Sequence, residues 1–256
     1  MELTDERVHG MYRRNSEHLG TYPHSHALIW QQSPPVNYVI HPSDPSTPLH
    51  FVVVGTVNMQ RSHLGPVGDH GHSRQRLSTS EHVLTLERPK SSRLSSDWKI
   101  AVQTVKRLQT SALSHYIMPQ PIYPPSSLLP PFDEVRYPLL PPAGEKMTFR
   151  RPVFVSLDQS ATGVVDLCPR PDPRVDQSGM SRQLKADILK LYNDRLRFAH
   201  FNVTAHGDRP VLLWRLSDRM DGALVAVRFQ LLHTSAFQGE HFTAFMESVH
   251  ILATTR

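Results

Sequence analysis

Histidine and aspartate residues cluster in one short stretch of the chain, where they could bind a metal ion. The cluster consists of His63, Asp69, His70 and His72. Imidazole nitrogens and carboxylate oxygens are ligands of zinc, provided that the loop folds around the ion. The surrounding glycine, serine and arginine residues do not predict a rigid scaffold. We therefore interpret the stretch as an ordinary polar loop, and we assign no metal and no cofactor.

Motifs of the common enzyme classes do not occur in the sequence. It contains no glycine-rich phosphate-binding loop, no Gly-x-Ser-x-Gly elbow and no His-Glu-x-x-His helix. Cys168 is the single cysteine, which rules out an internal disulfide and a cysteine-based zinc site. It follows an apolar run, where a buried inert thiol is more common than a nucleophile. The sequence therefore predicts a non-catalytic protein, with an enzyme of unrecognised family as an alternative.

Positive charge is concentrated between residues 74 and 107. The basic residues of this stretch are Arg74, Arg76, Arg88, Lys90, Arg93, Lys99, Lys106 and Arg107. They exceed the three acids Glu81, Glu87 and Asp97 by five, which equals the net charge of the whole chain. Such a surface suits the phosphates of nucleic acid or the headgroups of anionic lipids. A solvated basic face without a partner is the alternative.

A proline-rich stretch divides the chain. Nine prolines lie between residues 118 and 142, which excludes a helix and predicts an extended, mostly unpaired backbone. The stretch contains two short peptides, one formed by Tyr123, Pro124 and Leu128 and the other by Tyr137, Pro138 and Leu140. Proline preorganises such a peptide for docking, and tyrosine and leucine can fill apolar pockets of a partner. The alternative is a plain linker whose side chains pack on its neighbours.

These two peptides resemble the late-domain peptides by which viral structural proteins recruit an adaptor of the ESCRT machinery. With its basic, cysteine-poor composition, the chain resembles a matrix protein of an enveloped negative-strand RNA virus, of the rhabdovirus type. That family usually places such peptides nearer the N-terminus. The resemblance implies peripheral binding to anionic membrane, contact with the nucleocapsid or RNA, and self-association into homo-oligomers. It also implies a location at the cytoplasmic face of host membranes and inside the virion. The residues themselves predict no signal peptide and no transmembrane segment, because residues 1–20 are polar and charged and no apolar run approaches the roughly 20 residues that span a bilayer.

Two other functions remain open from the residues alone. The basic stretch could instead serve a nucleic-acid-binding accessory or movement protein of a virus. The second alternative is the unrecognised enzyme.

Apolar patterning predicts the elements that position these residues. Strands are expected at 36–40, 49–57, 82–86, 149–157, 163–167, 211–216 and 223–232. Helices are expected after Ser95–Asp97, after Ser181, and at the end of the chain, where Phe242, Phe245, Met246, Val249 and Leu252 repeat at intervals of three and four. Asp221 and Gly222 predict a hairpin turn between the last two strands.

We expect an α+β fold, with an antiparallel sheet and packed helices, in two segments joined by the proline-rich linker. The predicted organisation is a flexible tail over 1–35, a segment over 36–117, the linker over 118–148 and a second segment over 149–256.

Overall fold

The fold is described by a computed structural model. The structure describes residues 5–13, 17–21, 28–31, 36–41, 43–72, 76–115, 146–156, 180–199, 201–205, 209–211, 216, 220–236 and 239–254. The Tyr123 and Tyr137 peptides, Arg74, Cys168, the strand predicted at 163–167 and most of the strand predicted at 211–216 lie outside these residues.

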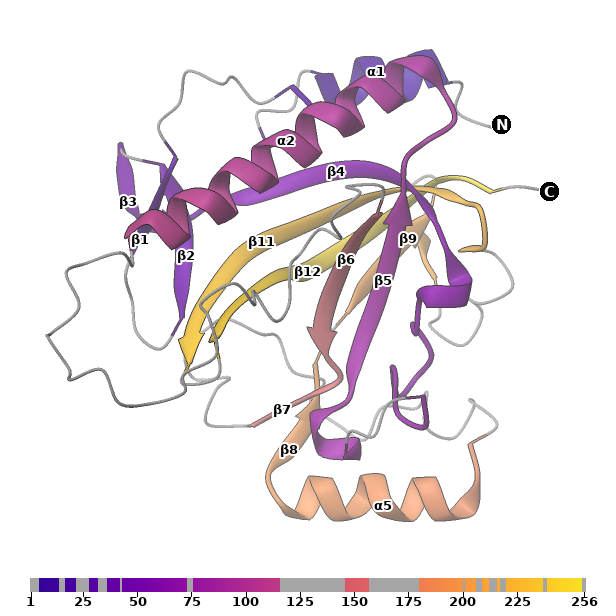
Figure 1. The fold of residues 1–256 in the computed structure, drawn as a ribbon. Coiled ribbons are helices and arrows are strands. Elements are labelled where there is room, and N and C mark those ends of the chain that lie inside the picture. Colours follow the sequence, from indigo (N-terminus) through magenta and orange to yellow (C-terminus); the bar gives the residue numbers. More distant parts are fainter. Residues whose placement is uncertain are drawn as a thin grey trace, which may run out of the picture.

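Five strands close into a β-barrel (Figure 1). They are β4 (His50–Val57), β5 (Glu81–Glu87), β6 (Lys146–Pro152), β11 (Leu224–Ala236) and β12 (Gly239–Ala253). β4 pairs with β5 and β11, β5 pairs with β6, and β11 pairs with β12, all antiparallel. The barrel closes where β6 and β12 pair in parallel. Numbered along the chain, the five strands follow the order 1-2-3-5-4 around the barrel, which is the Greek-key order of an OB-fold.

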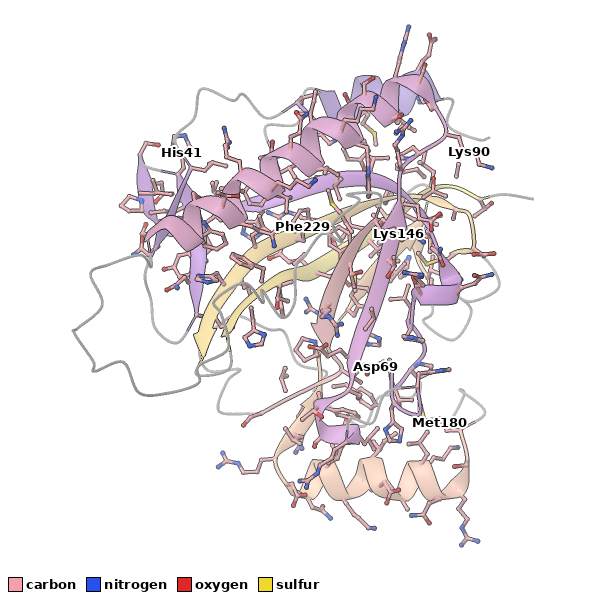
Figure 2. The ribbon with its side chains drawn as sticks, viewed as in Figure 1. His41, Asp69, Lys90, Lys146, Met180 and Phe229 are labelled. Carbon is pink, nitrogen blue, oxygen red and sulfur yellow. The ribbon has the colours of Figure 1, made fainter. Side chains whose placement is uncertain are left out.

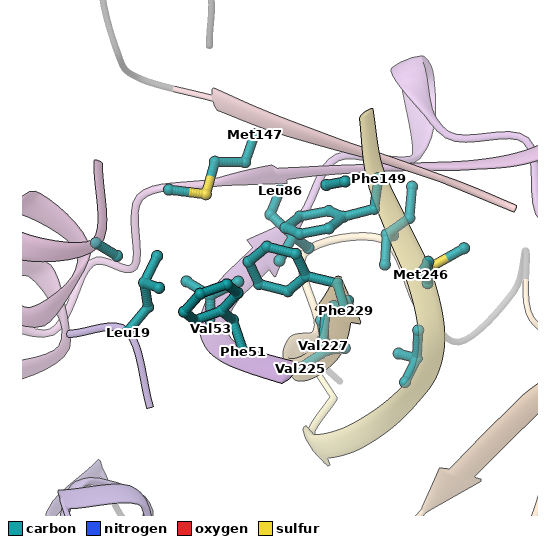
Figure 3. Packing of buried hydrophobic residues seen from close by; sticks show 14 of the residues in the cluster. Leu19, Phe51, Val53, Leu86, Met147, Phe149, Val225, Val227, Phe229 and Met246 are labelled. Atoms are coloured by element: carbon teal, nitrogen blue, oxygen red, sulfur yellow. The ribbon is translucent and has the colours of Figure 1, made fainter. Parts of the chain in front are cut away.

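Aromatic side chains fill the interior of the barrel (Figure 3). The ring centroid of Phe229 lies 5.9 Å from that of Phe51 and 5.0 Å from that of Phe149. Leu84 and Met246 belong to the same buried cluster. Because successive side chains of a strand point to opposite faces, the neighbours of these residues in sequence lie on the outside of the barrel.

Helix α2 (Ser92–His115) packs on β4. The predicted apolar stripe of this helix is confirmed as buried and consists of Trp98, Ala101, Val102, Val105, Leu108 and Ala112. Gly55 on β4 permits the close approach, since a Cβ atom there would lie 2.9 Å from Cζ3 of Trp98. The helix begins before the predicted cap at Ser95–Asp97.

Shorter elements extend the barrel (Figure 1). Helix α1 (Asp5–Arg13) lies beside α2, and Val8 is buried with Leu94 and Val52. The sheet also contains β1 (Ile29–Gln31), β2 (Asn37–His41), β3 (Asp44–Pro48), β9 (Asn202–Ala205) and β10 (Arg209–Pro210). The strands β7 (Phe154–Ser156) and β8 (Leu196–Phe198) form a separate two-stranded sheet beside α5 (Arg182–Asn193). The predicted cap of α5 is confirmed, because Ser181 Oγ accepts a hydrogen bond from the Leu184 amide.

The expected α+β fold is wrong. Strands dominate the described residues, and the sheet is mixed rather than antiparallel. Strands from both sides of the proline-rich stretch, β4 and β5 before it and β6, β11 and β12 after it, pair in one barrel. Apolar patterning underestimated the strands, because several strands pair with partners far away in the sequence and local patterns do not report such pairing.

The expected closing helix is also wrong, since residues 239–253 form β12. The pairing register passes from Phe229–Met246 to Arg228–Ser248, so Glu247 is an extra residue in a β-bulge. The inward positions therefore run through Phe242, Ala244 and Met246 and then resume at Val249. A step of three residues at the bulge imitates helical spacing.

The predicted hairpin turn at Asp221–Gly222 does precede β11, and Gly222 has a φ of +68°. Among the described residues β11 pairs with β2, β4 and β12, and the strand predicted to form the hairpin with it lies mostly outside those residues. None of the helices in the described part of the chain is long and apolar enough to cross a membrane.

Candidate functional site

A row of side chains crosses the outer face of the barrel over β5 and β6. His63 pairs with Val83 of β5, Val83 pairs with Arg150 of β6, and Arg150 pairs with Phe245 of β12. Residues directly opposite each other on paired strands lie on the same face. The neighbours Leu84, Phe149, Ala244 and Met246 point into the core. The outer row therefore combines an imidazole, an aliphatic side chain, a guanidinium group and an aromatic ring.

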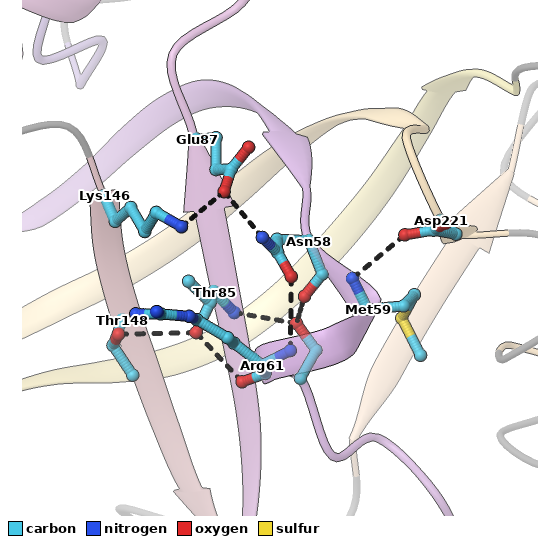
Figure 4. Close-up of polar contacts among 9 residues, drawn as sticks. Asn58, Met59, Arg61, Thr85, Glu87, Lys146, Thr148 and Asp221 are labelled. Atoms are coloured by element: carbon cyan, nitrogen blue, oxygen red, sulfur yellow. Dashed lines mark hydrogen bonds and ion pairs between the residues drawn. The ribbon is translucent and has the colours of Figure 1, made fainter.

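A polar cluster occupies one end of this face (Figure 4). The Glu87 carboxylate accepts hydrogen bonds through the same oxygen from Lys146 Nζ at 2.7 Å and from Asn58 Nδ2 at 2.6 Å. These two bonds lower the pKa of Glu87, and the positive charges of Lys146 and Arg61 lower it further. A single carboxylate thus pairs with one cation and feels the charge of a second, as an anionic ligand could.

Hydrogen bonds fix the backbone that carries Arg61. The Asn58 side chain accepts a hydrogen bond from the Arg61 amide at 3.2 Å, and Thr85 Oγ1 donates to the Arg61 carbonyl at 3.0 Å. The hydroxyls of Thr85 and Thr148 lie 3.4 Å apart across β5 and β6. The buried Thr85 side chain therefore anchors the segment that carries Arg61, and strand pairing sets the geometry of the backbone in the cluster.

The other end of the face contains a second ion pair. Arg150 Nη1 lies 2.7 Å from Glu81 Oε2, and both side chains remain partly exposed. Asp69 closes this end, because its carboxylate accepts a hydrogen bond from the Glu81 amide at 2.8 Å. The outer face of β5 and β6, including residues 58–63, is called the β5–β6 face below. It presents the cations Arg61, Lys146 and Arg150, and two of them already hold carboxylates.

The predicted basic stretch is spread over several elements. Arg76 precedes a short 3-10 helix (η2, Leu77–Thr79), and Arg88 and Lys90 lie between β5 and α2. Arg93 forms an exposed ion pair with Glu6 of α1 at 3.0 Å. Lys99, Lys106 and Arg107 are exposed on α2 and share its solvent face at helical spacing. No acidic residue occurs from Trp98 to the end of this helix, so its outer surface forms a positively charged stripe.

Imidazole rings of the histidine loop stack instead of converging on a common point. The ring centroids of His63 and His72 lie 4.5 Å apart, with their planes inclined by 21°. Within the described residues, no group of three or more histidine, cysteine, aspartate or glutamate side chains is placed to share a metal ion.

Sequence reasoning missed the cations of the β5–β6 face. Arg61 lies just before the basic stretch, and Lys146 and Arg150 follow the proline-rich stretch. Residues 146–150 do alternate between outward polar and inward apolar positions, as a half-buried strand should, whereas Arg151 places a charged side chain at the next inward position. That alternation was a usable signal for Lys146, Thr148 and Arg150. Their proximity to Arg61 depends on strand pairing, which the sequence does not display.

Comparisons with known proteins find one group of solved structures with a loosely similar fold. No protein-family model matches the chain, and no curated protein matches it in sequence. The single-stranded DNA-binding protein gp2.5 of bacteriophage T7 is 12% identical, with a TM-score of 0.43 over 81% of this chain and 93% of its own. A single-stranded DNA-binding protein from bacteriophage Enc34, in complex with single-stranded DNA, is 13% identical, with a TM-score of 0.41 over 90% and 97% of the two chains. Both TM-scores lie below 0.5, so the likeness is loose.

The resemblance to a rhabdovirus matrix protein is wrong. The similar solved structures are phage single-stranded DNA-binding proteins and not matrix proteins. Tyrosine–proline peptides that end in leucine arise readily by composition in a proline- and leucine-rich stretch, so they carried little information about ancestry. The matrix interpretation is withdrawn, together with budding, binding to anionic membrane and recruitment of an ESCRT adaptor.

Proposed function

We propose that this chain binds single-stranded nucleic acid on the β5–β6 face and does not catalyse a reaction. The observation that carries the proposal is the barrel order, which makes β5 and β6 the second and third strands of an OB-fold. That face is where OB-folds bind oligonucleotides. Here it presents Arg61, Lys146 and Arg150 to solvent.

The side chains on this face suit an unpaired strand. Single-stranded nucleic acid is bound by cations that follow the phosphates and by rings on which bases stack. The row over β5 and β6 supplies a cation, Arg150, with the rings of His63 and Phe245 in the same cross-strand row. A duplex hides the flat faces of its bases, so only an unpaired strand can use both kinds of contact.

The positively charged stripe on α2 supports the same function as an outer contact. Lys99, Lys106 and Arg107 face solvent together on α2. We propose that this stripe attracts phosphates of the same strand without holding bases, because no aromatic residue accompanies the cations on the exposed face of α2.

Titration of fluorescent oligonucleotides tests the proposal. The full chain should bind single-stranded oligonucleotides more tightly than duplexes of equal length, as measured by fluorescence anisotropy. The logarithm of the binding constant should fall linearly with the logarithm of the salt concentration, with a slope of about −0.7 for each phosphate contact. Equal affinity for single strands and duplexes, or an affinity independent of salt, would show that the proposal is wrong.

Substitution of Glu87 should increase the affinity for single-stranded oligonucleotides. The carboxylate of Glu87 is paired with Lys146 and interacts electrostatically with Arg61, so a phosphate must compete with it for these cations. We expect Glu87→Gln to strengthen binding by about fivefold at low salt, since a neutral amide neither repels phosphate nor holds Lys146 as firmly. Glu6→Gln is the matched control, because Glu6 also pairs with a cation but lies on α1. Equal gains for both variants would contradict a phosphate site beside Glu87.

A further inference from the structure

The imidazole rings of His63 and His72, which lie outside the polar cluster around Glu87, stack on each other, and one of the two rings is exposed. The ring centroids of His63 and His72 are 4.5 Å apart, and their planes differ by 21°. His63 is partly buried, whereas His72 is exposed. The His63 ring therefore lies on the barrel side of the stack, and the His72 ring lies on the solvent side.

Backbone hydrogen bonds hold both rings to β5. The His63 amide donates to the Val83 carbonyl at 2.7 Å, and the Val83 amide donates back to the His63 carbonyl at 3.1 Å. The His72 amide donates to the Asp69 carbonyl at 3.0 Å, and the Asp69 amide donates to the Glu81 carbonyl at 2.8 Å. Because Val83 and Glu81 both belong to β5, the backbone that carries the two stacked rings is positioned before any ligand arrives. Such preorganisation reduces the entropy that is lost on binding.

The position and the protonation of His63 both favour stacking. His63 lies in the same cross-strand row as Val83 and Arg150. Burial lowers the pKa of His63, and the positive charge that His72 can carry lowers it further, while Asp69 opposes the shift. The lowered pKa favours the uncharged imidazole, which stacks without the cost of burying a charge.

We propose that the His63–His72 stack is a base-binding subsite, in which an unpaired nucleobase stacks on the exposed ring of His72. The proposal rests on the proposed function and assigns one base contact within it. Bases of single strands stack on histidine as well as on larger aromatic side chains. Arg150, in the row of His63, can hold the phosphate of the same or the next nucleotide. The subsite takes any base, because stacking uses the flat face that all bases share.

Variants of His72 test the subsite in the full chain. Anisotropy would be measured with an oligonucleotide of about 12 deoxythymidines and with an abasic strand of the same length. We expect His72→Ala to weaken binding of the thymidine strand by about fivefold and to leave the abasic strand unchanged. His72→Phe should bind the thymidine strand at least as tightly as the unaltered chain, since it retains a flat ring. A 2-aminopurine placed within the strand should lose fluorescence on binding to the unaltered chain and lose less of it with His72→Ala.

A distant histidine supplies the control. His41 lies at the end of β2, far from Asp69 (Figure 2), and its Nδ1 contacts Ser43 Oγ at 2.6 Å. His41→Ala should leave both affinities unchanged. Normal binding by the unaltered chain and by His72→Ala alike would overturn the subsite but leave the proposed function intact. Equal losses on thymidine and abasic strands, or an equal loss in His72→Phe, would also overturn it. Failure of the unaltered chain to bind any single strand would overturn both proposals.

Discussion

Replacing Arg61, Lys146 and Arg150 together with glutamine should lower the affinity for single-stranded oligonucleotides by about 100-fold relative to the unaltered chain. These three cations are the arginine and lysine side chains that the described residues of the β5–β6 face present to solvent. Each lost contact on a single strand should also reduce the salt slope by about 0.7, so the slope should become shallower by about 2. Anisotropy titrations at several salt concentrations measure both quantities in one series.

The control for this triple variant removes the same charge from α2. Replacement of Lys99, Lys106 and Arg107 with glutamine lowers the net charge equally. We expect a loss of about fivefold, because the stripe contributes general attraction without base contacts. A larger loss for the α2 variant than for the β5–β6 variant would move the interface to the helix and contradict the proposed site. Denaturation curves should show little change for either variant, since exposed ion pairs contribute little to stability.

The elements that the sequence predicted well are those with a local cause. Residues 49–57 are β-branched or apolar almost throughout, and both faces of β4 are buried, one in the barrel and the other beneath α1 and α2. The stripe of α2 repeats at helical spacing because one side of the helix packs on β4. In both segments the residues that decide the structure are neighbours along the chain, so the pattern is visible before folding.

Prediction was wrong where distant residues decide the structure. Glu247 forms a bulge only because β11 pairs with β12, and without that partner the spacing of apolar residues in 242–252 indicates a helix. Barrel closure likewise depends on the parallel pairing of Phe149 with Ala244, across 95 positions of sequence. Charge counting located the basic stretch, whereas the cations of the β5–β6 face come from segments on both sides of the proline-rich stretch. The pairing of distant strands therefore brings the cations of the candidate site together. Counting charges along the sequence identified only the basic surface on α2.

Alanine at Gly68 should destabilise the fold by about 3 kcal/mol relative to the unaltered chain. Gly68 has a φ of +59°, which costs a side chain about 1 kcal/mol, and an added Cβ atom would lie 2.1 Å from the Glu81 carbonyl oxygen. The loop must then move away from β5, which breaks the hydrogen bond from the Asp69 amide to that oxygen. Urea denaturation followed by circular dichroism measures the loss of stability.

Substitutions at two other glycines of the same loop separate the free-energy cost of a positive φ from the cost of a steric clash with the added Cβ atom. Gly71 has a φ of +90° but nothing within 4 Å of an added Cβ, so Gly71→Ala should cost about 1 kcal/mol. Gly65 has open space and no positive φ, and Gly65→Ala should change the free energy of unfolding by less than about 0.5 kcal/mol. If Gly68→Ala costs no more than Gly71→Ala, the loop is not held against Glu81 as described. In that case His72 would not be fixed in place beside His63, because the same Asp69 backbone links the His72 amide to β5.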